Sequence, residues 1–344
     1  MKGTEQGVRK NSRRCLLYPV LLLALLILAI PLQVGASRAE TDSDADTAVP
    51  VVSIVFSDRS KLQTDISLAL LQQLTDARSP AQPLQIRLIH ADSADAKEPG
   101  ETRNSDLVIS IGSENVNYAK SLFPPTPVIA IVSNPGKQVP GNTRDKPAIL
   151  YMTQPFCRQL SLIHLLNPNW RRVSYLTSRA DYPDEKSFRR CASMFQLEAY
   201  RQYNDDPEFL SADLRTALHN SDLLLALPDG NIYNRKTVKN ILLTSYRMRK
   251  PVIAFSENFV NAGAIAAIHS SSQQIAQTAS RLVYDYFSSG RKLNWHKAWP
   301  DDFDISINRQ VFRALNLPLP DTGKIKKQIM QSGKANADAA GDAQ

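Results

Sequence analysis

The chain alternates between short apolar runs and longer amphipathic stretches, and this alternation restricts the folds that it can adopt. Val51-Val52-Ser53-Ile54-Val55-Phe56 is a nearly continuous apolar run, whereas apolar residues recur at helical spacing across 60–76. Short apolar runs predict strands buried on both faces of a sheet, and helical spacing predicts an amphipathic helix. Because helices separate the strands, right-handed crossovers predict a parallel α/β sheet.

The alternation occurs twice. The strands predicted for the first unit lie at 51–56, 84–89, 106–111 and 127–132. Residues 136–148 are rich in glycine and proline and mark the clearest internal boundary. The strands predicted after it lie at 172–176, 197–203, 223–227, 251–255 and 265–268. The fold class predicted is therefore α/β, with two Rossmann-like lobes, each with a parallel sheet, and a cleft between them.

The boundaries of the predicted regions follow from composition and pattern. They are a signal peptide at 1–39, a disordered leader at 40–48, lobe 1 at 49–150, lobe 2 at 151–269, a return segment at 270–320 that packs on lobe 1 and the hinge, and a disordered tail at 321–344.

The N-terminal segment has the features of an export signal. A basic head precedes an apolar stretch at 15–30, and small residues follow, with cleavage expected after Ala36 or Ala39. An uncleaved membrane anchor is the alternative, because the apolar stretch approaches spanning length. Either reading places the body of the protein outside the cytoplasm, and we expect it in the periplasm.

The net charge does not point to nucleic acid. The chain carries +8, with 41 basic and 33 acidic residues. Of this surplus, +5 belongs to residues 1–39, where six basic residues face a single glutamate. The remaining surplus gives no reason to invoke DNA, RNA or acidic lipid as a partner.

Two cysteines remain after the export signal, Cys157 and Cys191. In an oxidising compartment they can form one disulfide, and each falls in a predicted helix of lobe 2. Two buried thiols are the alternative. Without clustered histidines they predict no zinc site.

Polar residues follow most of the predicted strands. Because parallel strands end at one edge of a sheet, these residues predict a site for a small polar or zwitterionic ligand. Helix capping is the alternative for any single position. Tyr182, Tyr233 and Phe259 lie near the strand ends and either stack on a planar ligand or pack between lobes. The candidate ligand-binding residues are Ser57, Ser113, Asn134, Thr177, Asp229, Asn231 and Ser256.

Signals of catalysis are missing from the sequence. It has no glycine-rich dinucleotide pattern, phosphate loop, nucleophile elbow or paired-histidine zinc motif. Its five histidines are scattered singly. We therefore predict neither an enzyme nor a cofactor or metal site, and keep an exported α/β hydrolase as an alternative.

A segment of lobe 2 resembles a known family. The segment is LPDGNIYNRKTVKNILLTSYRMRKPVIAFSENFVNAGAIAAI. It has a strand ending in a Pro-Asp turn, a helix, a PVI strand, and a helix followed by Gly-Ala-Ile. This order is similar to that of ABC-transporter substrate-binding proteins, the family that includes tryptophan and tyrosine uptake proteins. The likeness extends over about residues 50–320.

The resemblance implies a type I periplasmic binding protein fold, in which two lobes on a three-strand hinge close over a ligand. It also implies an inner-membrane permease with a cytoplasmic ATPase as partner, a monomeric protein, and a small ligand such as an aromatic amino acid. The family's ligand contacts would correspond to residues on the strand-end loops, and Asp229 would suit a ligand amine. The segments 91–104 and 134–148 depart from the family pattern. A ligand-sensing accessory protein of a membrane partner is the alternative.

Overall fold

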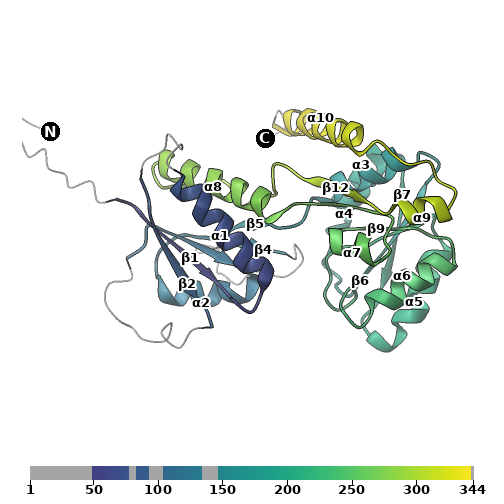
Figure 1. Ribbon diagram of the computed structural model, residues 1–344, viewed down its shortest axis with the longest axis horizontal. Coiled ribbons are helices and arrows are strands. Elements are labelled where there is room, and N and C mark those ends of the chain that lie inside the picture. Colours follow the sequence, from purple (N-terminus) through teal and green to yellow (C-terminus); the bar gives the residue numbers. More distant parts are fainter. Residues whose placement is uncertain (1–48, 77–82, 93–103, 134–145, 342–344) are drawn as a thin grey trace, which may run out of the picture. The chain divides into compact units, whose positions relative to one another are not determined.

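A computed structural model describes residues 49–76, 83–92, 104–133 and 146–341 (Figure 1). The predicted signal peptide, the leader and Asn134 lie outside these ranges. Residues 48–344 form one compact unit. Within it the strands gather into two six-stranded sheets.

The sheet of lobe 1 is parallel throughout and has the strand order β11-β5-β4-β3-β1-β2. Its register pairs Ile54 with both Leu88 and Ile109, which places apolar residues side by side across the sheet. The bounds of its strands are β1 Val51–Phe56, β2 Gln85–His90, β3 Leu107–Ile111, β4 Val128–Val132, β5 Ala148–Tyr151 and β11 Lys297–Ala298.

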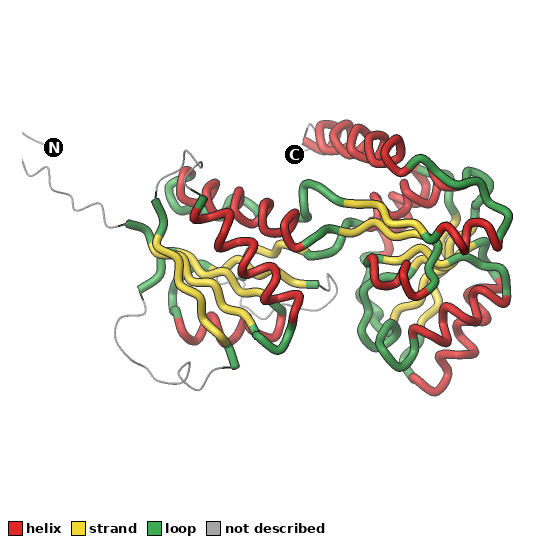
Figure 2. The backbone as a smooth tube through the Cα atoms, in the orientation of Figure 1, coloured by secondary structure: helices red, strands yellow, loops and turns green. Residues whose placement is uncertain are grey.

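Helices cover both faces of this sheet because its strands are apolar on both faces (Figure 2). On one face, Ile66 and Leu282 pack with Ile54 of the sheet. On the other, Phe123 packs with Val55, the next residue along the strand. The helices of lobe 1 are α1 Lys61–Thr75, the 3₁₀ turn η2 Ser113–Asn115, α2 Val116–Leu122 and α8 Ser272–Ser288.

The sheet of lobe 2 has the order β12-β10-β9-β8-β6-β7, and only β12 runs antiparallel to its neighbour. The bounds of its strands are β6 Arg172–Thr177, β7 Glu198–Tyr203, β8 Leu223–Leu225, β9 Val252–Ala254, β10 Ala266–His269 and β12 Asp304–Ile307. Its helices are α3 Phe156–Leu166, α4 Glu185–Met194, the 3₁₀ turn η3 Pro207–Phe209, α5 Leu210–His219, α6 Val238–Arg247, α7 Glu257–Ala262, α9 Arg309–Ala314 and α10 Thr322–Gly341.

Two clusters of apolar side chains hold lobe 2 together, one on each face of its sheet. Leu160 and Phe188 pack with Leu223 on one face. Leu214 and Ile241 contribute to the cluster on the other. A disulfide between Cys157 of α3 and Cys191 of α4, with a Cα–Cα distance of 5.2 Å, joins the helices of the first cluster. Of the two states left open by the sequence, the structure has the disulfide.

The α/β fold with two Rossmann-like lobes is confirmed. The chain passes from one sheet to the other three times, after β5, after β10 and after β11. The passages lie at 152–155, 270–271 and 299–303, and together they form the hinge segments.

The return segment differs from its prediction. Helix α8 and strand β11 do belong to lobe 1, but β12 and α9 complete lobe 2. Phe303 and Phe312 are buried in the core of lobe 2, and Ile305 and Ile307 pack against it. The alternation in Asp304-Ile305-Ser306-Ile307 suits an edge strand, because Ile305 and Ile307 share the face that packs against the core and no residue of β12 is fully buried.

The predicted disorder of 321–344 is wrong for most of its length. Helix α10 spans Thr322–Gly341, and Ile325 and Ile329 are buried in the core of lobe 2. These two residues are one helical turn apart and therefore lie on one face. The sequence did not predict this helix because its short apolar stripe lies among many alanine, lysine and glycine residues.

Candidate functional site

Both sheets contain a point where the strand order reverses. Strand β1 lies between β2 and β3, and β6 lies between β7 and β8. Successive crossovers leave such a strand on opposite sides, so a crevice opens at the carboxyl ends of the strands there. The loops at these points contain Ser57 and Ser113 in lobe 1, and Ser178 and Asp229 in lobe 2.

In lobe 2, a buried carboxylate connects the two loops. Asp229 is 3% exposed. Its Oδ2 accepts hydrogen bonds from the Ser178 N–H at 2.7 Å and the Ser178 hydroxyl at 2.9 Å, and its Oδ1 accepts one from the Asn231 N–H at 3.1 Å. The Asn231 amide also donates to Ser178 Oγ at 3.1 Å. No Lys or Arg of the described ranges forms an ion pair with Asp229, so only neutral donors compensate its charge.

In lobe 1, a buried amide connects the corresponding loops. Gln63 of α1 accepts hydrogen bonds through Oε1 from the Ser57 N–H at 2.9 Å and from Asn115 Nδ2 at 3.0 Å. Its Nε2 donates to Glu114 Oε1 at 2.5 Å. Gly112 precedes this turn with a φ of 97°, and a Cβ there would lie 2.5 Å from Gln63 Nε2. Only glycine adopts this backbone without strain.

A hollow of about 550 Å³ adjoins both sets of loops. Three of the predicted ligand-binding residues line it: Ser113, Asp229 and Asn231. Thr153, from the segment after β5, also lines it, and its buried hydroxyl has no hydrogen-bond partner among the described residues. A buried hydroxyl without a partner is uncommon, which makes Thr153 a candidate donor to a ligand.

Arg179 brings a positive charge to the same hollow. Its Nε and Nη2 donate to the two carboxylate oxygens of Asp181 at 3.0 and 2.7 Å. The hydrogen bond and charge of Arg179 hold the pKa of Asp181 below its ordinary value. The hollow is therefore lined by two carboxylates, those of Asp229 and Glu114, and by one guanidinium, which is paired with Asp181 outside the lining.

Aromatic rings complete the lining. Tyr233 and Phe255 both line the hollow, with ring centroids 6.3 Å apart. Burial raises the pKa of Tyr233 above its ordinary value, and the charge of Asp229 raises it further. Burial and Asp229 raise the pKa of Tyr182 in the same way, but Tyr182 is not part of the lining. Phe259 packs on Tyr233 and Phe255 inside lobe 2.

Three predicted residues do not reach the hollow. Thr177 is fully buried, and its hydroxyl donates to the Tyr182 carbonyl at 2.8 Å, so it fixes the loop after β6. Ser57 bonds through its hydroxyl to Asp92. Ser256 begins α7 and is outside the lining. Ser178, the neighbour of Thr177, is the residue that bonds to Asp229. Thr153 and Arg179 line the hollow but were not among the predicted residues.

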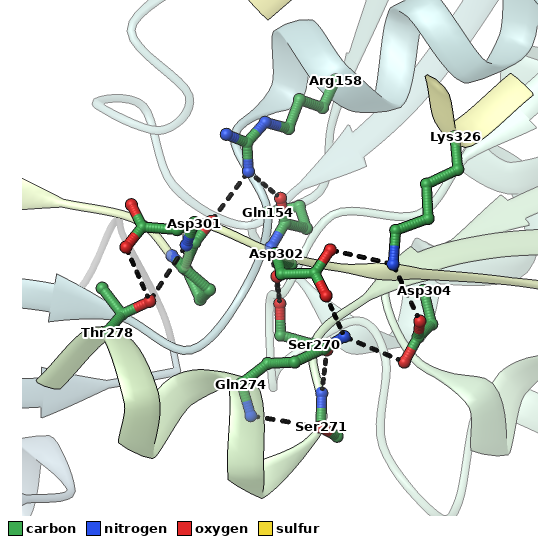
Figure 3. Close-up of polar contacts among 11 residues, drawn as sticks. Gln154, Arg158, Ser270, Ser271, Gln274, Thr278, Asp301, Asp302, Asp304 and Lys326 are labelled. Carbon is green, nitrogen blue, oxygen red and sulfur yellow. Dashed lines mark hydrogen bonds and ion pairs between the residues drawn. The ribbon is translucent and has the colours of Figure 1, made fainter. Parts of the chain in front are cut away.

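The three hinge segments are hydrogen bonded to one another (Figure 3). Gln154 Nε2 donates to Ser270 Oγ at 2.6 Å, and Ser270 Oγ donates to the Asp302 carbonyl at 2.9 Å. Arg158 of α3 adds bonds to Gln154 Oε1 at 2.6 Å and to the Pro300 carbonyl at 2.8 Å. One polar chain thus crosses all three segments.

Helix α10 contacts the same region through Lys326. Its ammonium lies 2.8 Å from Asp302 and 3.3 Å from Asp304 (Figure 3). Burial acts to raise the pKa of Asp302, but the hydrogen bonds from Lys326, the Phe303 backbone and Gln274, together with the charge of Lys326, hold the pKa below its ordinary value. Gln274 of α8 donates to both carboxylates, at 3.0 and 3.1 Å.

Comparison with known proteins identifies the family. A family model described as ABC transporter substrate binding protein matches residues 101–326. The chain belongs to this family. None of the curated proteins matches this substrate-binding protein by sequence.

Solved structures agree on the fold of this substrate-binding protein. It is similar to the ABC domain in complex with L-Trp from Streptococcus pneumoniae, with 14% identity, a TM-score of 0.55, and coverage of 81% of this chain and 98% of that one. It is also similar to the ligand-free, open structure of a substrate-binding protein with adhesive properties from Clostridium difficile, with 15% identity, a TM-score of 0.58, and coverage of 79% and 97%. Such low identities bear on the fold alone.

Two further properties concern the described part of this substrate-binding protein. None of its helices combines the length and apolar character needed to cross a bilayer. Among these residues there is also no group of three or more His, Cys, Asp or Glu side chains arranged to hold a metal ion.

Proposed function

We propose that this substrate-binding protein is the exported component of an ABC importer and binds a small zwitterionic solute in the hollow lined by Asp229 and Thr153. The observation that carries the proposal is the presence, at the carboxyl edge of the sheets, of a buried carboxylate held only by neutral donors and of a buried hydroxyl without a hydrogen-bond partner among the described residues. A ligand ammonium would supply the missing positive charge near Asp229. The protein itself performs no reaction in this proposal.

An aromatic amino acid fits the rest of the lining. The rings of Tyr233 and Phe255 give the hollow apolar surface, and Arg179 gives it a cation for a carboxylate. The similar Streptococcus pneumoniae protein was solved with L-Trp, which supports testing this class first. The partners in this proposal are a membrane permease with its ATPase, and the protein acts in the periplasm as a monomer.

The test is thermal unfolding of residues 40–344 with and without each of the twenty amino acids, and with nucleosides and sugars. A ligand that binds only the folded state stabilises it by about 2.7 kcal/mol at a hundred times its dissociation constant. A rise in the unfolding midpoint with L-Trp or L-Tyr is expected. The absence of any shift, after unfolding and refolding to remove co-purified ligand, would contradict the proposal.

Two variants locate the bound solute. Asp229→Asn and Thr153→Val keep the shape of each side chain while removing the charge or the hydroxyl, and each should weaken binding at least about tenfold. Thr216→Val is the matched control, because Thr216 lies exposed on α5 and is not part of the lining. Unchanged affinity in both site variants would place the ligand elsewhere.

A further inference from the structure

Lobe 2 has two segments from which acidic residues are missing. From Gly230 to Ser256 the chain has six Lys or Arg residues and no Asp or Glu, and from Ile305 to Pro320 it has two Arg and again no acid. The chain as a whole has 33 acidic residues against 41 basic ones, so average composition does not explain this segregation. The basic residues are Arg235, Lys236, Lys239, Arg247, Arg249, Lys250, Arg309 and Arg313.

Helical geometry gathers part of this set on the outer side of α6. Lys239, Leu243 and Arg247 are spaced by four residues and therefore share one stripe of the helix. Leu243 is 41% exposed, and its neighbour on this side, Tyr246, is 53% exposed. The opposite side of α6 is buried through Ile241, Leu242 and Ser245.

No acidic residue pairs with these eight basic side chains within the described ranges. The side chain of Lys250 alone among them forms a hydrogen bond, because its ammonium donates to the backbone carbonyl of Ser221 at 2.5 Å. The other seven are exposed, and their side chains form no hydrogen bond or ion pair with any residue inside the described ranges. On α4, by contrast, Arg189 pairs with Glu185 at 2.7 Å.

Helix α9 lies beside the end of α6. Tyr246 of α6 and Lys250 after it line one small hollow together with Val311 of α9 and Leu315 after it, so the two helices are neighbours. The hollow has a volume of only about 10 Å³. It is too small to receive a side chain of a docking protein.

We propose that this surface, the α6 face, docks on an anionic lipid surface; it comprises Lys236, Lys239, Leu243, Tyr246, Arg247 and Arg249. Basic residues near a bilayer are attracted to acidic headgroups, and leucine and tyrosine side chains insert at the boundary between headgroups and acyl chains. A protein partner would instead require a well-packed interface core, for which this face has no receiving pocket. The inference does not depend on the ligand of the hollow.

This face changes the conclusion drawn from net charge. The modest surplus over the whole chain gave no reason to invoke acidic lipid. The net charge of the whole chain does not reveal this face, because acidic residues elsewhere in the sequence offset its basic residues.

The test uses residues 48–344, which form one compact unit and lack the apolar N-terminal segment. The protein is sedimented with vesicles of phosphatidylcholine alone, or with one quarter phosphatidylglycerol. Binding to the anionic vesicles at low salt, and loss of binding at high salt, is expected. The double variant Lys239→Gln/Arg247→Gln should lower the partition coefficient about 25-fold, since each basic residue contributes about fivefold, or about 1 kcal/mol.

The matched control is Lys186→Gln/Arg190→Gln on α4, which removes the same charge from another exposed helix of lobe 2. It should bind the anionic vesicles like the unchanged protein. Equal losses in both double variants, or no binding to anionic vesicles, would overturn the proposal. Retention on immobilised polyglutamate, lost only in the α6 variant and without vesicle binding, would overturn it in favour of an acidic protein partner.

Discussion

The two lobes share a topology but connect their strand-end loops with different chemistry. In lobe 1 the neutral amide of Gln63 joins the loop after β1 to the loop after β3. In lobe 2 the carboxylate of Asp229 joins the loop after β8 to the loop after β6. Lobe 2 also has a disulfide between its helices. The comparison teaches that the same pair of strand-end loops can be joined by a neutral side chain in one lobe and by a charged side chain in the other.

The largest expected effect comes from removing the disulfide that joins two helices of lobe 2. Replacing Cys157 and Cys191 by alanine opens a loop with a sequence separation of 34 residues. This should lower the free energy of unfolding of lobe 2 by about 3–4 kcal/mol, because the unfolded chain gains conformational freedom.

Hydrogen exchange measures this effect lobe by lobe. Amides of β6 and β8 should lose protection, whereas those of β1 and β3 should keep it. An equal loss of amide protection in both sheets would show that the lobes unfold as one unit. The disulfide would then not distinguish the stability of lobe 2 from that of lobe 1.

The second prediction compares a glycine from each set of loops. Gly112→Ala should lower the free energy of unfolding by about 2–3 kcal/mol, because its φ of 97° strains any side chain and the new Cβ meets Gln63 and Glu114. Gly230→Ala is the control, since a Cβ there meets nothing within 4 Å. Urea unfolding of the two variants measures the difference, and similar midpoints would contradict the structure of the lobe 1 turn.

The third prediction gives lobe 1 the chemistry of lobe 2. Gln63→Glu places a carboxylate against Glu114, to which Gln63 Nε2 now donates at 2.5 Å. The free energy of unfolding at pH 7 should fall by about 2 kcal/mol through lost hydrogen bonding and repulsion. The deficit should shrink as the pH falls, because protonation of one carboxyl restores a donor.

Gln72→Glu, on the exposed side of the same helix, is the control for the added charge. Its stability should stay within about 0.5 kcal/mol of that of the unchanged protein. A deficit of Gln63→Glu that does not depend on pH would point to lost packing instead of repulsion.

The smallest expected effect concerns the contact of α10 with the hinge. The folded-state pKa of Asp302 is lowered, so its contribution is present above the unfolded pKa of about 3.9 and is lost as the pH falls through the folded pKa. Lys326→Met should cost about 0.5–1 kcal/mol at pH 7, since the pair is partly exposed. Denaturant titrations over a series of pH values from 7 downwards test this, and a cost that does not decrease as the pH falls would rule out the ion pair as its source.

The sequence predicted the alternation of strands and helices well because short apolar runs identify buried strands. It also placed Ser113, Asp229 and Asn231 near the hollow, since parallel strands end at one edge. The pattern does not show which of two adjacent side chains faces the neighbouring loop, so Thr177 was predicted, whereas Ser178 is the residue that bonds to Asp229. Strand β5 was missed because it begins at Ala148, inside the segment 136–148 that was interpreted as a boundary.

The residues that the sequence did not find depend on tertiary contacts. Thr153 reaches the hollow only because β5 joins the sheet beside β4. Arg179 follows β6 directly, but nothing in the pattern shows where its guanidinium lies. The burial of Ile325 and Ile329 could not be predicted from the pattern, because it depends on the packing of α10 against α3.

The distribution of each lobe along the chain limits the order in which the protein can fold during synthesis. Lobe 1 buries Ile275 and Leu282 of α8, which follow the last parallel strand of lobe 2. Lobe 2 in turn buries Phe303, Phe312 and Ile329. A nascent chain that stops before α8 therefore contains neither core in complete form, and both lobes reach their final packing only when nearly the whole polypeptide has emerged.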